Sequence, residues 1–258
     1  MHILVTNDDG ITSPSLLVLA QEMRKVGEVT VLAPDRNWSA SGHVKTMHRP
    51  LRVWEAQMAD GTFGLTTDGA PSDCVALAML GLLPDKVDLV VSGINPNANL
   101  GHDVTYSGTV TSAMEASIWG LPGIAISLDS PEIDPNSIDF GPAARIAHKV
   151  VQEVLANDLP EGIFLNVNVP NLSDNEIRGI CITRQGLRLY RDQLIERHDP
   201  RGQPYYWIGG EKPTGLPEDG NDFGALREGY VSITPLHLDL TAYRIINEMK
   251  KWSWGRRY

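Results

Sequence analysis

The chain has 258 residues, 42% hydrophobic and 21% charged, which is the composition of a soluble globular protein with a sizeable core. Its formal net charge is −10 and it contains no run of Lys and Arg, which argues against a nucleic-acid duplex or an anionic membrane as a partner. No apolar stretch approaches the roughly 20 residues of a membrane span, and no signal peptide is evident at the N-terminus. Cys74 and Cys181 form no CxxC pair and sit among apolar residues, so we expect buried thiols in a reducing compartment and a cytoplasmic protein.

The first 170 residues alternate short apolar runs with amphipathic segments, which predicts a doubly wound α/β fold with a mostly parallel, Rossmann-like sheet. A β-hairpin over 50–56 and 62–67 is indicated by the turn dipeptide at Asp60 and Gly61. The other expected elements are strands over 3–6, 29–33, 87–92, 124–128 and 163–169 and helices over 16–26, 70–83, 110–119 and 138–157.

From residue 171 onward the pattern changes to short strand-like runs with Gly and Pro turns, and a final helix is expected over 240–251. The stretch 184–228 predicts an extended β-hairpin arm with the aromatic cluster Tyr205, Tyr206 and Trp207. Either a second subunit or the chain's own core could bury these rings, and the sequence leaves both open. With no repeat or linker, we expect one domain over 1–258, with a core over 1–170 and an elaboration over 171–258.

Two adjacent carboxylates, Asp8 and Asp9, follow the first strand and precede Gly10. Ligands of open α/β sheets bind beyond the carboxyl ends of the strands, where this pair is expected to lie. Adjacent carboxylates repel each other unless a cation or a proton neutralises them, which favours a divalent cation. The alternative is ordinary turn chemistry, for which Asp and Gly are common.

Two further loops at the same sheet edge carry neutral oxygen donors, which suit Mg²⁺, Mn²⁺ or Ca²⁺ better than Zn²⁺. The histidines show no HxxxH or HxH spacing that would indicate a histidine-rich metal site. The candidate donors are Asn37 with Ser39 or Ser41 in one loop, and Asn95, Asn97 and Asn99 in the other.

Ser107, Gly108 and Thr109 stand at the start of an expected helix, where free backbone N–H groups could bind a phosphate. The alternative is that Ser107 or Thr109 simply caps the helix. The chain has no GxxxxGK[ST], no GxGxxG after the first strand and no GxSxG, which argues against a P-loop, a dinucleotide cofactor and a nucleophile elbow.

Several motifs in order along nearly the whole chain resemble the SurE family of metal-dependent nucleoside-monophosphate phosphatases. The motifs are Asn7-Asp8-Asp9-Gly10, Ala33-Pro34-Asp35-Arg36-Asn37 with Ser39, Thr67-Asp68-Gly69-Ala70-Pro71-Ser72-Asp73-Cys74, Ser92-Gly93-Ile94-Asn95, Asn99-Leu100-Gly101, Tyr106-Ser107-Gly108-Thr109-Val110, Leu165-Asn166-Val167-Asn168-Val169-Pro170 and Gly229-Tyr230-Val231-Ser232-Ile233-Thr234-Pro235-Leu236. The chain departs from the family pattern in two loops. The loop Asn95-Pro96-Asn97-Ala98-Asn99 differs from members that often have Gly or Ala among the intervening positions, and Ala40 follows Ser39 where the family often has Gly.

The resemblance implies one divalent ion per subunit, Mg²⁺ or Mn²⁺, with the metal ligands Asp8, Asp9, Ser39 and Asn95. It implies phosphate contacts from Asn95, Ser107, Gly108 and Thr109. In this mechanism a metal-activated water attacks the phosphate, and Asp8 and Asp9 are the catalytic residues, with Asp9 orienting the water or accepting its proton.

The resemblance further implies hydrolysis of nucleoside 5′- and 3′-monophosphates to nucleoside and phosphate, with short polyphosphate as a substrate of some members. It also implies a homodimer or homotetramer assembled through the C-terminal arm.

Two other functions remain open from the residues. A phosphatase of the haloacid dehalogenase type needs DxDx[TV] after the first strand, and Asn7 stands where its nucleophilic Asp would be. A non-catalytic nucleotide or polyanion sensor on the same fold is the second alternative.

Overall fold

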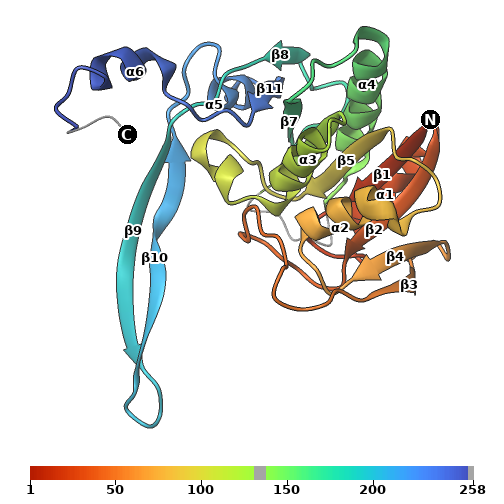
Figure 1. Cartoon of the computed structure of the whole chain (residues 1–258), viewed down its shortest axis with the longest axis horizontal. Helices are drawn as coiled ribbons and strands as arrows, with labels where there is room; N and C mark the ends of the chain where they lie inside the picture. Colours follow the sequence, from red (N-terminus) through yellow and green to blue (C-terminus); the bar gives the residue numbers. More distant parts are fainter. Residues whose placement is uncertain (131–137, 255–258) are drawn as a thin grey trace.

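The computed structural model describes residues 1–130 and 138–254. Within these ranges a nine-stranded sheet forms the body of the molecule, in the order β3-β4-β2-β1-β5-β6-β7-β11-β8 (Figure 1). Its strands are β1 (His2–Thr6), β2 (Glu28–Pro34), β3 (Val53–Gln57), β4 (Phe63–Thr67), β5 (Leu89–Asn95), β6 (Gly123–Asp129), β7 (Ile163–Pro170), β8 (Ile180–Ile182) and β11 (Val231–His237).

Six successive strands of the sheet, β4, β2, β1, β5, β6 and β7, run parallel to one another. The predicted doubly wound α/β fold with a mostly parallel sheet is therefore confirmed. The predicted hairpin at Asp60 and Gly61 is also present, as the antiparallel pair β3 and β4. At the other edge β11 pairs antiparallel with β7, and β8 pairs parallel with β11. These two C-terminal strands therefore extend the core sheet.

Helices cover both faces of the sheet, because alternate residues of each central strand point to opposite sides. Ile3 and Val5 of β1 pack in the cluster that contains α1 and α4, whereas Leu4 packs in the cluster that contains α2. The helical segments are α1 (Pro14–Met23), α2 (Pro71–Leu77), η1 (Ala78–Leu82), η2 (Gly101–Thr105), α3 (Gly108–Ile118), α4 (Gly141–Asn157), α5 (Asp222–Arg227) and α6 (Tyr243–Met249).

Several predicted boundaries differ from the structure. The helix expected over 70–83 is α-helical only to Leu77 and continues as the π-helical segment η1, in which Gly81 has a positive φ of 99° that an α-helix does not accommodate. The helix expected over 16–26 begins at Pro14, whose fixed φ suits the first turn, and ends at Met23. The final helix is α6, shorter than the predicted 240–251.

The C-terminal arm is a long antiparallel hairpin of β9 (Arg188–His198) and β10 (Pro204–Gly215), and it projects away from the body (Figure 1). The predicted arm, 184–228, is therefore too long. Residues 222–227 form α5, which returns to the body because Phe223 and Leu226 are buried against Leu100. None of the residues of α6, all within the described part of the chain, is buried.

Three further predictions meet the structure in part. Cys74 is buried as expected, but Cys181 lies on β8 near the sheet edge and is only half-buried. No helix in the described residues is long and apolar enough to cross a membrane. The predicted domain, 1–258, includes 131–137 and 255–258, which lie outside the described residues.

Candidate active site

The turn after β1 is held by the side chain of Asn7, which is completely buried. Asn7 Nδ2 donates to the backbone oxygen of Gly10, and Asn7 Oδ1 accepts from the backbone N–H of Gly10, both at 3.1 Å. Both functions of this amide are therefore used to close the turn. At the position where a haloacid dehalogenase would have its nucleophile, this chain has a structural residue, and the turn presents Asp8 and Asp9 at the edge of the sheet.

Asp8 is buried beneath the N-terminus of α3. The Thr109 hydroxyl donates to Asp8 Oδ1 at 2.5 Å. Burial raises the pKa of the Asp8 carboxyl, and hydrogen bonds from the Thr109 side chain and from the backbone of Thr109 and Gly108 oppose that rise. The first anion stabilised by this helix terminus is therefore the chain's own carboxylate.

Gly108 allows α3 to approach Asp8 this closely. A Cβ at position 108 would lie 2.7 Å from Asp8 Cβ, 3.1 Å from Asp8 Oδ2 and 3.1 Å from Pro71 Cγ. Such distances are shorter than carbon contacts allow, so no larger residue fits here without a shift of α3 or of the β1 turn.

Of the two carboxylate oxygens of Asp9, one accepts a hydrogen bond and the other has no partner in the described residues. Asn37 Nδ2 donates to Asp9 Oδ1 at 3.2 Å, whereas Asp9 Oδ2 is buried without a hydrogen-bond partner in the described residues. Burial, and then repulsion from Asp8, raise the pKa of Asp9 to about 7. A buried, unpartnered carboxylate oxygen beside a second carboxylate fits a divalent cation, which would lower that pKa and satisfy the free oxygen.

The loop after β2 is connected to Asp9 through Asn37. Asn37 Oδ1 accepts from the backbone N–H of Ser39 at 2.7 Å, while the other end of the same amide binds Asp9. The backbone N–H of Trp38 donates to the backbone oxygen of Asp8 at 2.7 Å. These contacts bring Ser39, an exposed side chain, to the sheet edge that carries the two aspartates.

The loop after β5 contains three asparagines with different roles. Asn99 is buried, and its backbone N–H and side-chain amide donate to Asn168 Oδ1 and Ser127 Oγ, both at 2.8 Å. Asn166 donates in turn to the backbone oxygen of Asn99 at 2.8 Å. Asn99 therefore shapes the loop, and Asn95 is a partly exposed residue whose Nδ2 donates to the backbone oxygen of Asn97 at 2.5 Å. All three asparagines line the cavity described next.

A polar cavity of about 430 Å³ opens at this edge and brings together Asp8, Ser39, Asn95 and Ser107. Four residues that the sequence predicted from three separate loops and one helix start are thus gathered in one place. Ser107 also caps α3, since its Oγ accepts from the backbone N–H of Val110 at 3.1 Å, so the capping alternative is confirmed for this residue.

Asp9, Gly108 and Thr109 are not among the residues that line the cavity. Asp9 is hydrogen-bonded to Asn37 beside it, and the Thr109 hydroxyl already donates to Asp8. Among the described residues no group of three or more His, Cys, Asp and Glu could hold a metal. A metal here would instead be held by two carboxylates and neutral oxygens, the donor set of Mg²⁺ or Mn²⁺.

Comparison with known proteins matches residues 3–192 to the family model described as Survival protein SurE. The chain belongs to the SurE family. Curated relatives named 5′-nucleotidase SurE include one from Chloroflexus aggregans, 49% identical over 254 residues that cover 98% of this chain and 100% of the relative. One from Herpetosiphon aurantiacus is 51% identical over 255 residues, covering 99% of each chain. The crystal structure of the SurE protein from Aquifex aeolicus matches with a TM-score of 0.83 and 43% identity, over 97% of this chain and 98% of that one.

The cavity of this SurE-family chain is also lined by three residues that were not predicted as site residues from the sequence: Asp103, Tyr106 and Arg188. Asp103 and Tyr106 stand in and directly after η2, and Arg188 is the first residue of the arm strand β9. A signal was available for Tyr106, which belongs to the Tyr106–Val110 motif. Arg188 gave none, because only the fold brings the root of the arm to this cavity.

The segment that follows Ser39 is anchored on α3 by a buried carboxylate, Glu115. Although burial raises its pKa, hydrogen bonds from His43, Trp119 and Lys45 bring the pKa of Glu115 down to about 2. His43 Nε2 lies 2.7 Å from Glu115 Oε2. His43 therefore contributes to fixing this loop.

Asp73 extends this anchoring to α2. Its carboxylate accepts from the backbone N–H and hydroxyl of Thr46 at 2.9 and 2.6 Å, and from the backbone N–H of Ala70 at 2.9 Å. Within the Thr67–Cys74 motif, Asp73 thus positions the loop that contains Thr46, whereas Pro71 lies beside Gly108.

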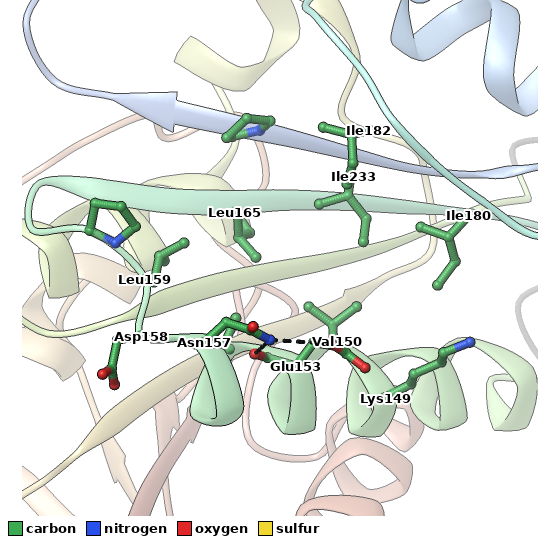
Figure 2. A pocket seen from close by; sticks show the side chains of 13 residues that line it. Lys149, Val150, Glu153, Asn157, Asp158, Leu159, Leu165, Ile180, Ile182 and Ile233 are labelled. Carbon is green, nitrogen blue, oxygen red and sulfur yellow. Dashed lines mark hydrogen bonds between the residues drawn. The ribbon is translucent and has the colours of Figure 1, made fainter.

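A second cavity of about 550 Å³ lies between α4 and the strands β7, β8 and β11 (Figure 2). Side chains such as Val150, Leu165, Ile180 and Ile233 make most of its lining apolar. Glu153, one of its few charged residues, already accepts a hydrogen bond from Asn157 Nδ2 at 3.3 Å. This apolar surface lacks the Asp8 carboxylate and the neutral oxygens that line the polar cavity, so the polar cavity is the candidate active site.

Proposed function

We propose that this chain is a metal-dependent nucleotidase that hydrolyses nucleoside 5′- and 3′-monophosphates to nucleoside and phosphate, with short polyphosphate as a further substrate. The names of its relatives support the 5′ activity. The observation that carries the proposal is the pair Asp8 and Asp9 at the edge of the sheet, with Asp9 Oδ2 buried and unpartnered in the described residues. Such a pair is neutralised by a cation or a proton, and a cation beside a helix N-terminus is suited to a phosphate.

In this proposal Asp8, Asp9, Ser39 and Asn95 hold one Mg²⁺ or Mn²⁺ ion per subunit. When bound, that ion supplies Lewis acidity to a phosphoryl oxygen and lowers the pKa of a water molecule. The Asp8 side chain is fixed in its orientation, because it accepts hydrogen bonds from the Thr109 hydroxyl and the α3 backbone. Preorganised ligands of this kind cost no reorganisation during the reaction.

The remaining steps belong to the chain's own groups. Asp9, whose buried oxygen Oδ2 has no hydrogen-bond partner in the described residues, orients the attacking water and accepts its proton. The Ser107 side chain, together with Asn95, contacts the phosphate from the cavity wall. The N-terminus of α3 contributes its partial positive charge to the oxygens on which negative charge develops.

The test is phosphate release from 5′- and 3′-monophosphates and tripolyphosphate with Mg²⁺, Mn²⁺, Co²⁺ or EDTA, for the unsubstituted chain and for Asp8→Asn and Asp9→Asn. We expect each variant to lose about 100-fold or more in turnover, since a metal-site carboxylate is removed. Asp60→Asn, at the exposed β3–β4 turn, is the matched control and should keep full activity. Near-normal turnover of Asp8→Asn or Asp9→Asn would contradict the site assignment.

The second candidate is a non-catalytic nucleotide or polyanion sensor, which the same cavity could serve. It predicts saturable binding of a nucleoside monophosphate without phosphate release under any of these metals. We place the protein in the cytoplasm, and we propose that it assembles as a homodimer or homotetramer through the β9–β10 arm.

A further inference from the structure

Arg188 is the cationic side chain among the described residues that line the candidate active-site cavity, whose charged lining is otherwise Asp8 and Asp103. It is the first residue of β9, so it reaches the cavity from the root of the arm. The strand-end loops that supply the predicted metal ligands lie far from it in sequence. The arm thus contributes a charged group to the site.

The guanidinium of Arg188 is held on two sides. Its Nε lies 2.9 Å from Asp103 Oδ2, and its Cζ lies 5.7 Å from the centroid of the Phe223 ring. Phe223 is itself buried against Leu100 and Leu226. Tyr190 donates from its hydroxyl to the other oxygen of Asp103 at 2.5 Å, which fixes that carboxylate in turn. Arg188 is therefore preorganised and exposes only a fifth of its side chain.

Its side-chain nitrogens nevertheless donate no hydrogen bond to the part of the chain that the structure describes. The Arg188 Nε is buried, and its contact with Asp103 is not aligned as a hydrogen bond. No acceptor among the described residues is found for its two terminal nitrogens. A buried donor without an acceptor costs free energy, and a guanidinium has a planar fork of donors that matches the oxygens of a phosphate.

Electrostatics point the same way. A nucleoside monophosphate is a dianion, and the chain carries a net charge of −10. Asp8 and Asp9 would largely balance a divalent ion, so the ion leaves little net positive charge for the substrate. Asp103 lies on the Nε side of Arg188. Asp129 is also near: burial raises its pKa, and the charge of Arg188 opposes that rise. In the described residues neither carboxylate is hydrogen-bonded to the two terminal nitrogens of Arg188. An oxyanion in the cavity is the acceptor that this arrangement lacks.

We propose that Arg188 binds a phosphoryl oxyanion of the substrate and is a substrate-binding residue of the site, an inference that rests on the proposed nucleotidase function. The substrate phosphate then lies between the two aspartates with the start of α3 on one side and a guanidinium from the arm on the other. The arm, beyond its proposed role in assembly, completes the substrate-binding surface.

The experiment measures KM and kcat for a nucleoside 5′-monophosphate, and Ki for inorganic phosphate, in Arg188→Gln with the preferred metal. We expect KM and Ki to rise on the order of 10- to 100-fold, the value of a charge-assisted hydrogen bond, with a much smaller change in kcat. Arg188→Lys keeps the positive charge but lacks the planar guanidinium donors, and it should show a smaller rise in KM and in the phosphate Ki. Arg184→Gln, an exposed arginine paired with Glu218 outside the cavity, is the matched control and should leave both constants unchanged.

Asp103→Asn separates this role from a structural one. If Arg188 binds the substrate, removal of the neighbouring negative charge lowers KM and the phosphate Ki, opposite in sign to Arg188→Gln. If Arg188 serves only to pair with Asp103, both substitutions raise KM by similar factors, and the proposal is overturned. An unchanged phosphate Ki in Arg188→Gln overturns it as well.

Failure of the proposed function is distinguished by the unsubstituted chain, which would then release no phosphate with any metal. Calorimetric binding of inorganic phosphate and of adenosine monophosphate, with Mn²⁺ present, still tests Arg188 in that case. Weaker binding by Arg188→Gln than by Arg184→Gln supports the inference, and equal binding overturns it. If thermal unfolding shows that Arg188→Gln does not fold, phosphate binding by Arg188→Lys is compared with that by Arg184→Gln instead. Weaker binding by Arg188→Lys then supports the inference, and equal binding overturns it.

Discussion

The sheet edge that carries Asp8 and the arm that begins at Arg188 differ in how their side chains are satisfied. At the sheet edge, polar groups such as Thr109 and Asn99 are buried and hydrogen-bonded within the chain. In the arm, large apolar side chains face outward: Leu194, Trp207 and Ile208 are 72%, 63% and 84% exposed. The geometry of the sheet edge is therefore fixed by the chain itself, whereas the arm presents a surface whose burial requires another molecule.

The largest effect that separates the two regions is expected from Gly108→Ala. The added methyl group would meet Asp8 and Pro71 at distances that force α3 away from the β1 turn. We expect a loss of about 100-fold in phosphate release, since a displacement of about 1 Å at a reacting centre has that effect. Overpacking should also lower the free energy of unfolding by about 1–3 kcal/mol. Steady-state kinetics measures the loss of phosphate release, and urea denaturation measures the free energy of unfolding.

Gly141→Ala is the matched control, because Gly141 is the first residue of α4 as Gly108 is the first of α3. Its added Cβ would meet only the ends of the Asp139 and Arg145 side chains, which can move. Activity should remain normal in this variant. Equal losses of phosphate release in Gly108→Ala and Gly141→Ala would mean that activity depends on a glycine at the start of a helix and not on the contact with Asp8.

A second prediction concerns pH and stability in the absence of divalent ions. Burial and the neighbouring Asp8 raise the pKa of Asp9 from 3.8 to about 7. Between these values the folded protein retains a proton that the unfolded chain has released, so the free energy of unfolding falls as the pH rises from about 4 to about 7. Urea denaturation in EDTA should show lower stability at pH 8 than at pH 5, and added Mn²⁺ should restore stability at pH 8.

Asp9→Asn should weaken this pH dependence without abolishing it, because the pKa of Asp8 is raised in the same direction. In Asp60→Asn, a change at an exposed carboxylate whose pKa is lowered to about 2, the decline between pH 5 and pH 8 should persist. Parallel pH profiles for Asp9→Asn and the unsubstituted chain would show that Asp9 is not held in the environment described.

Local sequence patterns sufficed to predict most of the sheet, because each apolar run of the first 170 residues ends in turn-forming residues. They failed for α5, a helix of six residues whose apolar contacts depend on Leu100, more than a hundred residues earlier. They predicted short strands beyond residue 171 but not that β11 and β8 join the core sheet, since pairing partners are set by the assembled sheet. Boundaries such as Leu77 depended on a single backbone angle at Gly81.

The site was predicted where residue chemistry is local, and missed where it depends on long-range pairing. Asp8 and Asp9 are adjacent in sequence, and their mutual repulsion can be inferred without a structure. The bonds of Asn37 to Asp9 and of Asn166 to Asn99 join residues 28 and 67 positions apart, and the sequence gives no register for them. Asn99, a candidate donor by its spacing, uses its backbone and its Nδ2 in that network.

The smallest expected effect on the folded chain comes from the arm, through Ile208→Asp. Because the Ile208 side chain is already largely exposed, its replacement should change the free energy of unfolding of the single chain by no more than about 0.5 kcal/mol. A charge at this apolar position should instead weaken contacts between subunits, since burying an unpaired carboxylate is costly. Size-exclusion chromatography with light scattering should show a shift to a smaller species. Gln193→Asp adds the same charge at a polar, exposed position of β9 and should leave the assembly unchanged, whereas a monomeric unsubstituted chain would remove the proposed role of the arm in assembly.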